Sequence, residues 1–176
     1  MQESDREIVL DALSIHERVV QMGQAISRDY AAGNLLVIGV LKGAFVFMAD
    51  LIRAIDIPLV VDFIQVSSYG HTSSSSGDII VRSKPTIAVQ DYDLLLVEDI
   101  IDSGLTLQWL SNHFISQGAR SVKICALIDK AERRAHQVQL DYCGFSVHDG
   151  FLVGYGLDFN EQYRHLPAIY HLKTPV

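Results

Sequence analysis

The sequence predicts an α/β fold, with a twisted, mainly parallel sheet flanked by helices and a small hood at one end. Strand-like apolar runs alternate with helical patterns through the first 128 of the 176 residues. Residues 94–97 show no polar alternation, which is typical of a strand buried on both faces. From residue 130 onward the pattern changes to short strands and turns. This length suits a single domain, 1–176, with the hood formed by about 1–13 and 130–176.

The first helix is predicted from its start signal and its apolar stripe. Ser14 and Glu17 have the spacing of a capping box, and Gly33 with Asn34 gives a stop signal. Apolar residues recur at helical spacing between these points: Ile15, Val19, Met22, Ile26 and Tyr30.

The other elements follow in the same way. Pro58 separates a helix at 44–55 from the next strand, and Gly118 ends a helix that extends to about Gln117. A Ser-rich stretch at 71–77 has little that could pack, so we expect a loop there. The predicted strands lie at 8–10, 35–40, 59–66, 78–82, 94–97, 122–128, 145–147, 151–153 and 168–172.

The composition excludes several classes of protein. The formal net charge is -7, and the longest visible basic cluster is Arg133 with Arg134, so a nucleic-acid partner is not expected. There is no apolar run long enough to span a membrane, and the N-terminus is polar and acidic, unlike a signal peptide. Cys125 and Cys143 lack metal-ligand spacing. We therefore expect a cytoplasmic protein with reduced cysteines.

The most informative stretch follows the apolar run at 94–97. Glu98 and Asp99 come first, and Asp102 precedes a turn of Ser103, Gly104, Leu105 and Thr106 that leads into a helix. A glycine lets the backbone approach an anion, and a helix N-terminus supplies free N–H donors, so the turn predicts a phosphate site. Three carboxylates suit sugar hydroxyls or a magnesium ion better than phosphate alone. A βα turn that merely carries several acids is the alternative interpretation.

The segment from Glu98 to Thr106 resembles the phosphoribosyl pyrophosphate signature of the type I phosphoribosyltransferases, and Ile100–Ile101 resembles their hypoxanthine-guanine branch. The resemblance implies a purine-salvage transferase that uses Mg²⁺. It would move the phosphoribosyl group from phosphoribosyl pyrophosphate to N9 of hypoxanthine or guanine, giving IMP or GMP and pyrophosphate. It also implies a homodimer or homotetramer, with no nucleic-acid or membrane partner.

Within that resemblance, residues of the turn bind the phosphoribosyl group: Glu98, Asp99, Asp102, Ser103, Gly104, Leu105 and Thr106. Asp102 would lie near N7 of the purine and act as the general base. Glu98 and Asp99 would face the ribose hydroxyls and, with Asp158, serve the metal. Neighbouring strand residues point to opposite faces, so the two acids cannot be equivalent unless the strand has already ended.

The same resemblance assigns the leaving group and the base. The pyrophosphate would be held by Leu41, Lys42, Gly43 and Arg164, often with a cis peptide between the first two. The purine would meet Lys130, Phe151, Leu152 and Asp158, with Lys130 donating to O6 and Phe151 stacking on the ring. Ser68 and Tyr69 would begin a flexible lid, at about 68–78, that excludes water from the reacting centre.

Two other functions stay open at this point. A regulator with the same fold would bind the sugar phosphate or a nucleic acid without catalysis, but the presence of Asp102 and Lys130 and the lack of a basic stripe disfavour it. A relative that uses adenine or orotate is the nearer alternative. The sequence contains no HExxH pair, P-loop or GxSxG elbow, which disfavours zinc hydrolysis, P-loop nucleotide hydrolysis and serine hydrolysis.

Overall fold

The computed structural model describes residues 6–68, 79–130, 136, 138–148 and 150–173. Three helices and nine strands lie within these residues. The helices are α1 (Ala12–Asp29), α2 (Phe45–Ala54) and α3 (Leu105–Ser116). The strands are β1 (Arg6–Leu10), β2 (Leu35–Leu41), β3 (Leu59–Ser68), β4 (Ile79–Ser83), β5 (Asp93–Ile101), β6 (Ser121–Asp129), β7 (Tyr142–Ser146), β8 (Leu152–Val153) and β9 (Ile169–Leu172).

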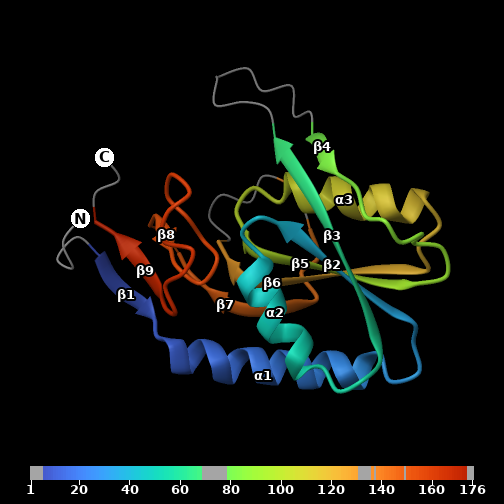
Figure 1. Cartoon of the computed structure of the whole chain (residues 1–176), viewed down its shortest axis with the longest axis horizontal. Coiled ribbons are helices and arrows are strands. Elements are labelled where there is room, and N and C mark those ends of the chain that lie inside the picture. The colour runs from blue at the N-terminus through green and yellow to red at the C-terminus, as the bar shows by residue number, and fades with distance from the viewer. Residues whose placement is uncertain (1–5, 69–78, 131–135, 137, 149, 174–176) are drawn as a thin grey trace.

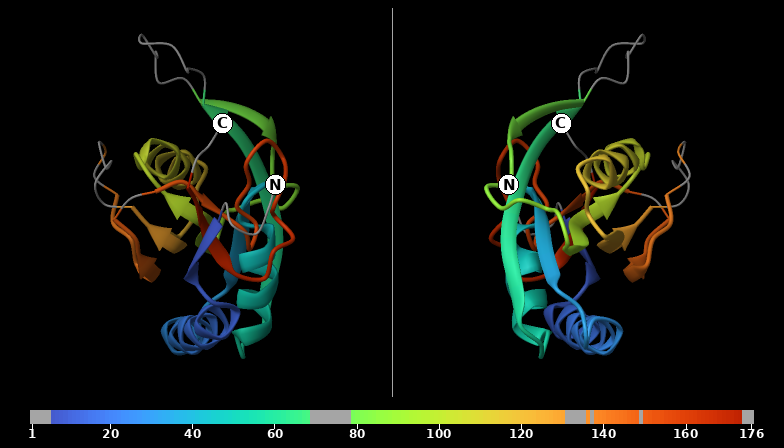
Figure 2. Two further views of the ribbon diagram at one scale, coloured as in Figure 1. Left: turned by 90° about the vertical axis from the view of Figure 1, so that its left-hand side faces the viewer. Right: turned by 90° about the vertical axis from the view of Figure 1, so that its right-hand side faces the viewer.

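Six strands form one twisted sheet in the order β4-β3-β2-β5-β6-β7 (Figure 1). All neighbours in this sheet are parallel except β3 and β4. Helices α1 and α2 lie on one side of the sheet and α3 lies on the other (Figure 2). The predicted mainly parallel α/β fold is therefore confirmed.

Strand β5 at the centre of the sheet explains the apolar run. Leu95 and Val97 pack in the core on the α1 and α2 side, whereas Leu94 and Leu96 pack on the α3 side. All four side chains have no exposed area. A strand covered on both faces needs apolar residues at every position, which is why polar alternation is missing.

Strand β5 is longer than predicted and includes the acids. Its pairing with β2 stops at Val97, but its pairing with β6 continues through Glu98, Ile100 and Ile101. The prediction that the strand ends before the acids is wrong, because one neighbouring strand still holds this segment extended.

The predicted start of the first helix is also wrong. Helix α1 begins at Ala12, and Asp11 is its N-cap, accepting from the backbone N–H of Ser14 at 2.9 Å. Asp11 follows Leu10, the last residue of β1, so the chain passes directly from strand to helix. Aspartate is as good a cap as serine, and the local sequence does not choose between them.

A second sheet, β1-β9-β8, forms the hood at the carboxyl end of the parallel strands (Figure 1). Both strand pairings in it are antiparallel. Strand β7 falls inside the 130–176 segment expected in the hood, but it pairs with β6 in the main sheet. The C-terminal strands of the hood sheet are therefore β8 and β9 alone. None of the described helices is long and apolar enough to cross a membrane.

Candidate active site

Two adjoining cavities open at the carboxyl end of β5. The larger, of about 530 Å³, is lined by Asp99, Asp102, Lys130, Phe151 and Asp158, among others. The smaller, of about 140 Å³, is lined by Glu98 in β5 and by residues of the turn between β5 and α3, including Gly104 and Thr106. Asp102 and Ile100 line both cavities. The fold thus joins a phosphate-sized recess to a larger chamber, with a carboxylate between them.

The smaller cavity is built by the turn between β5 and α3. Gly104 has a positive φ of 82° and immediately precedes the helix. A Cβ at this position would also lie 3.0 Å from the carbonyl oxygen of His136. Both the positive φ and this close contact therefore favour glycine at position 104. Ser103 Oγ accepts from the N–H of Leu105 at 3.4 Å. The first turn of α3 thus directs its N–H groups toward the recess, as an anion site requires.

Glu98 and Asp99 lie side by side in chain order but line different cavities. The N–H of Asp99 donates to Glu98 Oε1 at 3.2 Å, and the N–H of Ile100 donates to Asp99 Oδ1 at 2.9 Å. Burial raises the pKa of Glu98 well above its ordinary value, and the neighbouring Asp99 charge raises it further. Burial also raises the pKa of Asp99, although its hydrogen bonds oppose that shift.

Asp99 packs directly beneath the loop that follows β2. Its side chain is 8% exposed, and a Cβ on Gly43 would come within 1.7 Å of its Oδ2. Only glycine at position 43 leaves room for this carboxylate. Asp99 therefore supports the backbone of the Lys42–Gly43 loop, while Glu98 lines the smaller cavity.

The Leu41–Lys42 peptide bond at the start of this loop is cis. Lys42 is exposed, and its Nζ lies 3.0 Å from Glu161 Oε1. Arg164 Nη2 lies 3.2 Å from Glu161 Oε2 and 2.8 Å from Asp158 Oδ1. The structure thus joins Lys42, Glu161, Arg164 and Asp158 in one chain of ion pairs. Hydrogen bonds from Lys42 and Arg164 hold the pKa of Glu161 below its ordinary range.

The hood places Arg164 beside the loop. Arg164 Nη1 donates to the carbonyl of Gly156 at 2.8 Å, and a Cβ on Gly156 would lie 2.1 Å from the carbonyl oxygen of Gly43. Tyr155 Oη donates to Asp50 Oδ2 on α2 at 2.6 Å. These contacts fix the position of the hood relative to the main sheet.

The larger cavity carries an ammonium and an aromatic ring. Lys130 is 9% exposed, and its Nζ donates to the carbonyl of Gly150 at 2.7 Å. Phe151 is 41% exposed, and its ring meets that of Phe159 edge to face, with the centroids 5.4 Å apart. Leu152 is buried in β8. An exposed ring face and a fixed cation beside a carboxylate suit a flat, polar heterocycle.

Ser68 is the last residue of β3 and pairs with Ile79 of β4. Tyr69 and the rest of the expected lid, 69–78, lie outside the described residues. Among the residues that the structure describes, no three His, Cys, Asp or Glu side chains gather as a metal cage.

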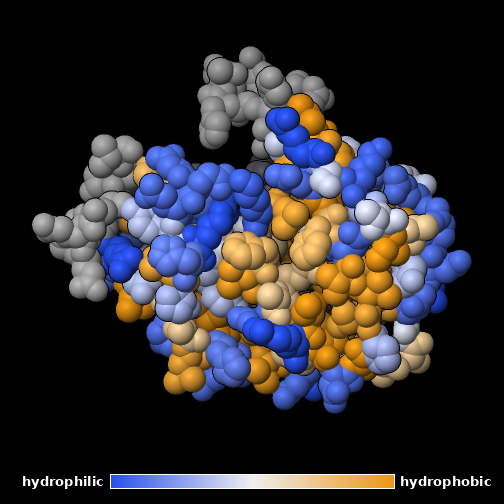
Figure 3. Space-filling view, viewed as in Figure 1, coloured by the Kyte–Doolittle hydropathy of each residue, from blue (hydrophilic) through white to orange (hydrophobic). Residues whose placement is uncertain are grey.

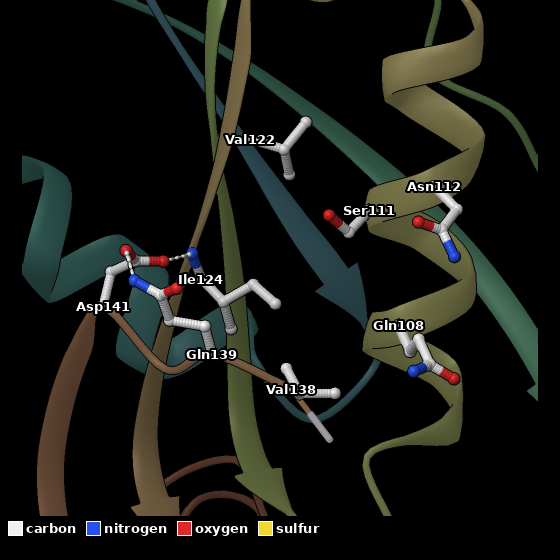
Figure 4. A pocket seen from close by; sticks show the side chains of 8 residues that line it. All are labelled: Gln108, Ser111, Asn112, Val122, Ile124, Val138, Gln139 and Asp141. Carbon is white, nitrogen blue, oxygen red and sulfur yellow. Dashed lines mark hydrogen bonds between the residues drawn. The ribbon is translucent and has the colours of Figure 1, made fainter. Parts of the chain in front are cut away.

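A separate cavity of about 360 Å³ lies between α3, β6 and residues 138–141 (Figure 4). Asp141 lines this cavity, and its carboxylate accepts hydrogen bonds from the N–H of Ile124 at 2.9 Å and from Gln139 Nε2 at 3.4 Å. None of the predicted site residues lines this cavity.

The family model for the phosphoribosyl transferase domain matches residues 6–160, which include all the candidate site residues except Glu161 and Arg164. The chain belongs to the phosphoribosyl transferase domain family. The hypoxanthine-guanine phosphoribosyltransferase of Bacillus subtilis (strain 168) is 43% identical to this family member over 176 residues, 100% of this chain and 98% of that protein. A protein of the same name from Mycobacterium tuberculosis (strain ATCC 25618 / H37Rv) is 41% identical over 170 residues, covering 93% of this chain and 84% of the other.

Solved structures give the same result for the fold. A hypoxanthine phosphoribosyltransferase from Staphylococcus aureus superposes with a TM-score of 0.93 at 36% identity, covering 97% of this chain and 93% of that one. A hypoxanthine-guanine phosphoribosyltransferase from Bacillus anthracis has a TM-score of 0.88 at 39% identity, with coverage of 94% and 97%. The type I phosphoribosyltransferase fold that the sequence resemblance implied is confirmed.

Sequence reasoning missed three contributors to the site of this phosphoribosyltransferase. Glu161 bridges two cations, Phe159 supports the ring of Phe151, and the carbonyl of Gly150 holds Lys130. Phe159 and Glu161 lie within three positions of Asp158, which the resemblance assigns to the purine and the metal, so their proximity to the site could be expected. Their partners could not, because backbone and side-chain contacts across a loop are invisible in a linear pattern.

Proposed function

We propose that this protein transfers the phosphoribosyl group from phosphoribosyl pyrophosphate to N9 of hypoxanthine or guanine, yielding IMP or GMP and pyrophosphate in purine salvage. The relatives named for this activity cover the chain nearly end to end. The observation that carries the proposal is Asp102, which lines both the phosphate recess and the cavity that contains Lys130 and Phe151. A carboxylate at this junction lies between a sugar phosphate and a base.

The base would occupy the larger cavity. Phe151 offers a ring face for stacking, and the ammonium of Lys130 has three donors, of which Gly150 takes one. A 6-oxopurine presents an acceptor at O6, whereas adenine presents an amino donor that would face the ammonium. Unpaired buried donors are costly, so this arrangement selects oxopurines.

The sugar phosphate would occupy the smaller recess. The N–H groups from Asp102 to Thr106 and the hydroxyls of Ser103 and Thr106 would bind the 5′-phosphate, with Gly104 and Leu105 contributing backbone only. Glu98, which lines this recess, would accept from a ribose hydroxyl. Asp99, held under Gly43, would act mainly by shaping the pyrophosphate loop.

In the reaction the N9–C1′ bond forms while the C1′–oxygen bond to pyrophosphate breaks, and pyrophosphate leaves with that electron pair. Asp102 would accept or relay the proton released from the imidazole ring of the base, near N7. Lys42 and Arg164 would neutralise the charge that develops on the leaving group, with Leu41 and Gly43 shaping the loop around it. Ser68 and Tyr69 would begin the segment that excludes water.

The donor set fits Mg²⁺, which prefers carboxylate oxygens and shares its coordination with substrate oxygens and water. Asp158 would reach the ion through water, and Glu98 and Asp99 would orient its hydrated shell or the ribose. When bound, the ion supplies positive charge that stabilises the departing pyrophosphate.

A base panel tests the function. With phosphoribosyl pyrophosphate and Mg²⁺, release of pyrophosphate should be fast with hypoxanthine or guanine and negligible with adenine and orotate. Lys130→Met should raise the KM for oxopurines at least about 10-fold, because a neutral chain cannot donate to O6. If no oxopurine led to release of pyrophosphate, a non-catalytic regulator would be favoured. If only adenine or orotate did so, a phosphoribosyltransferase specific for that base would be favoured.

A second variant tests the role of Asp102. Asp102→Asn should lower kcat by roughly 10²-fold or more, in line with the loss of general acid–base help. The KM for phosphoribosyl pyrophosphate should change little. Wild-type turnover across the pH range would refute the assignment of Asp102 as the base.

We infer further that the protein is a cytoplasmic homodimer or homotetramer. Apolar residues gather on the face that carries α2 and β3 (Figure 3), where Phe45 is 44% exposed and Phe63 is 39% exposed. An apolar face of this kind suits a second copy of the chain. Sedimentation equilibrium should give a mass of two or four chains, and a monomer at micromolar concentration would contradict the inference.

A further inference from the structure

Glu161 holds an unusual position between the two cations assigned to the pyrophosphate. Its Oε1 lies 3.0 Å from Lys42 Nζ, and its Oε2 lies 3.2 Å from Arg164 Nη2. Each oxygen of one carboxylate thus meets one cation, as two oxygens of a phosphate group would. Lys42 comes from the end of β2 and Arg164 from the loops of the hood, so this single side chain links the two parts of the site.

The backbone brings Glu161 to this place, and its side chain is free to leave it. Glu161 has a positive φ of 62°, and its N–H donates to Asp158 Oδ2 at 2.8 Å. The turn therefore depends on the backbone of residue 161 and on Asp158. The Glu161 side chain is 64% exposed, and ion pairs in such surroundings are weak enough to break readily.

We propose that Glu161 is a positioning residue that competes with pyrophosphate for Lys42 and Arg164. A pyrophosphate on these cations would bring its negative charge against the Glu161 carboxylate, and like charges so close repel. The carboxylate swings into solvent when phosphoribosyl pyrophosphate binds and returns to the cations as pyrophosphate leaves. It keeps both cations in place for the leaving group and lowers the affinity for the product, so that pyrophosphate departs sooner.

The contacts of Arg164 make the proposal testable. Arg164 also lies 2.8 Å from Asp158 Oδ1 and donates to the carbonyl of Gly156 at 2.8 Å. Its position therefore survives the loss of the Glu161 charge. The inference rests on the proposed function, since it assumes that Lys42 and Arg164 bind pyrophosphate.

Calorimetric titration with magnesium pyrophosphate provides the test, without turnover. Glu161→Gln should bind it about 3- to 10-fold more tightly than the wild type, because two exposed ion pairs no longer have to be broken. The KM for phosphoribosyl pyrophosphate should fall by a similar factor, and dissociation of pyrophosphate in stopped flow should slow. The ratio of the pyrophosphate affinity of Glu161→Gln to that of the wild type should fall toward one as the salt concentration is raised, because salt screens exposed ion pairs.

Glu17→Gln on the exposed face of α1 also removes one negative charge, and it controls for the effect of net charge on the binding of an anion. It should leave pyrophosphate affinity unchanged. Suppose that the wild type binds pyrophosphate and that Lys42→Ala weakens this binding. If Glu161→Gln then binds pyrophosphate no more tightly than the wild type, the proposed competition is wrong, but the pyrophosphate site is not. Failure of the wild type to bind pyrophosphate would instead overturn the proposed pyrophosphate site.

Discussion

Glu98 and Asp99 are adjacent in β5 but have different surroundings. Asp99 fills the space under Gly43, whereas Glu98 lines the smaller cavity beside the turn between β5 and α3. The continued pairing of β5 with β6 keeps the segment extended, but the two side chains stay close enough to hydrogen-bond to each other, and burial together with the Asp99 charge raises the pKa of Glu98. The two acids nevertheless line different cavities, Glu98 the smaller one and Asp99 the larger one.

At the same scale, Phe159 should determine how firmly Phe151 presents its ring. The two rings meet edge to face, an arrangement worth about 0.5–1.5 kcal/mol. Phe159→Ala should therefore raise the KM for hypoxanthine roughly 3- to 10-fold with little change in kcat. Steady-state kinetics with each substrate varied in turn would measure this.

Phe159→Tyr keeps the aromatic edge and serves as the matched control. Its KM for hypoxanthine should stay close to the wild-type value, and neither variant should alter the KM for phosphoribosyl pyrophosphate. An equal rise for both substrates in Phe159→Ala would show general damage to the hood and would refute a specific role in base stacking.

At the scale of elements, Asp93 ties the start of β5 to the start of β6. Arg120 Nε donates to its Oδ1 at 3.0 Å, and Ser121 Oγ donates to the same oxygen at 2.6 Å. The hydrogen bonds from Arg120 hold the pKa of Asp93 below its ordinary value, against the effect of burial. A lowered pKa in the folded state means that the ionised carboxylate stabilises the fold.

The sign of the pH dependence follows directly. The stabilisation from Asp93 is complete above the unfolded-state pKa, near 4, and is lost as the pH falls from there through the lowered folded-state pKa. Asp93→Asn should lower the free energy of unfolding by about 1–2 kcal/mol at pH 7, and by clearly less near pH 3. Urea unfolding at a series of pH values would measure the difference.

The exposed Asp56 supplies the control, because within the described part of the chain only its backbone N–H makes a hydrogen bond, to Ser27 Oγ at 2.8 Å. Asp56→Asn should change stability little at either pH. If Asp93→Asn cost the same at pH 3 as at pH 7, the stabilising role of the ionised carboxylate would be wrong.

At the scale of the whole molecule, the hood and the main sheet meet at two glycines. A Cβ on Gly156 would lie 2.1 Å from the carbonyl oxygen of Gly43, and the φ of Gly156 is 103°. Gly156→Ala should therefore cost roughly 3 kcal/mol in stability from overpacking and backbone strain together. Because the Gly43 carbonyl must shift, the affinity for pyrophosphate should fall as well.

Gly118 separates these two effects. Its φ is 93°, close to that of Gly156, but a Cβ there would meet only Gln90 Cγ, at 3.2 Å. Gly118→Ala should cost about 1–2 kcal/mol from strain alone and leave pyrophosphate affinity unchanged. Denaturation and calorimetry on both variants would check this, and equal losses of stability would argue against tight contact between hood and sheet.

Local patterns determined much of this protein. Apolar runs, turn residues and the spacing of acids and hydroxyls predicted the strands, the turn between β5 and α3 and the family, because each depends on residues within a few positions of one another. Boundaries were less secure: Asp11 rather than Ser14 caps α1, and β5 extends past the acids. In both cases a strand pairing with a distant segment decided the outcome.

Only the tertiary structure decided which residues of the candidate site contact one another. Lys42 and Glu161 form an ion pair although 119 positions separate them in the chain. The glycine at position 43 has meaning only because Asp99 fills the space beside it. Such contacts depend on how the hood packs on the sheet, and packing between distant segments leaves no periodic signal in the sequence. The sequence therefore determined which chemical groups the site contains, and the fold determined which of them act on one another.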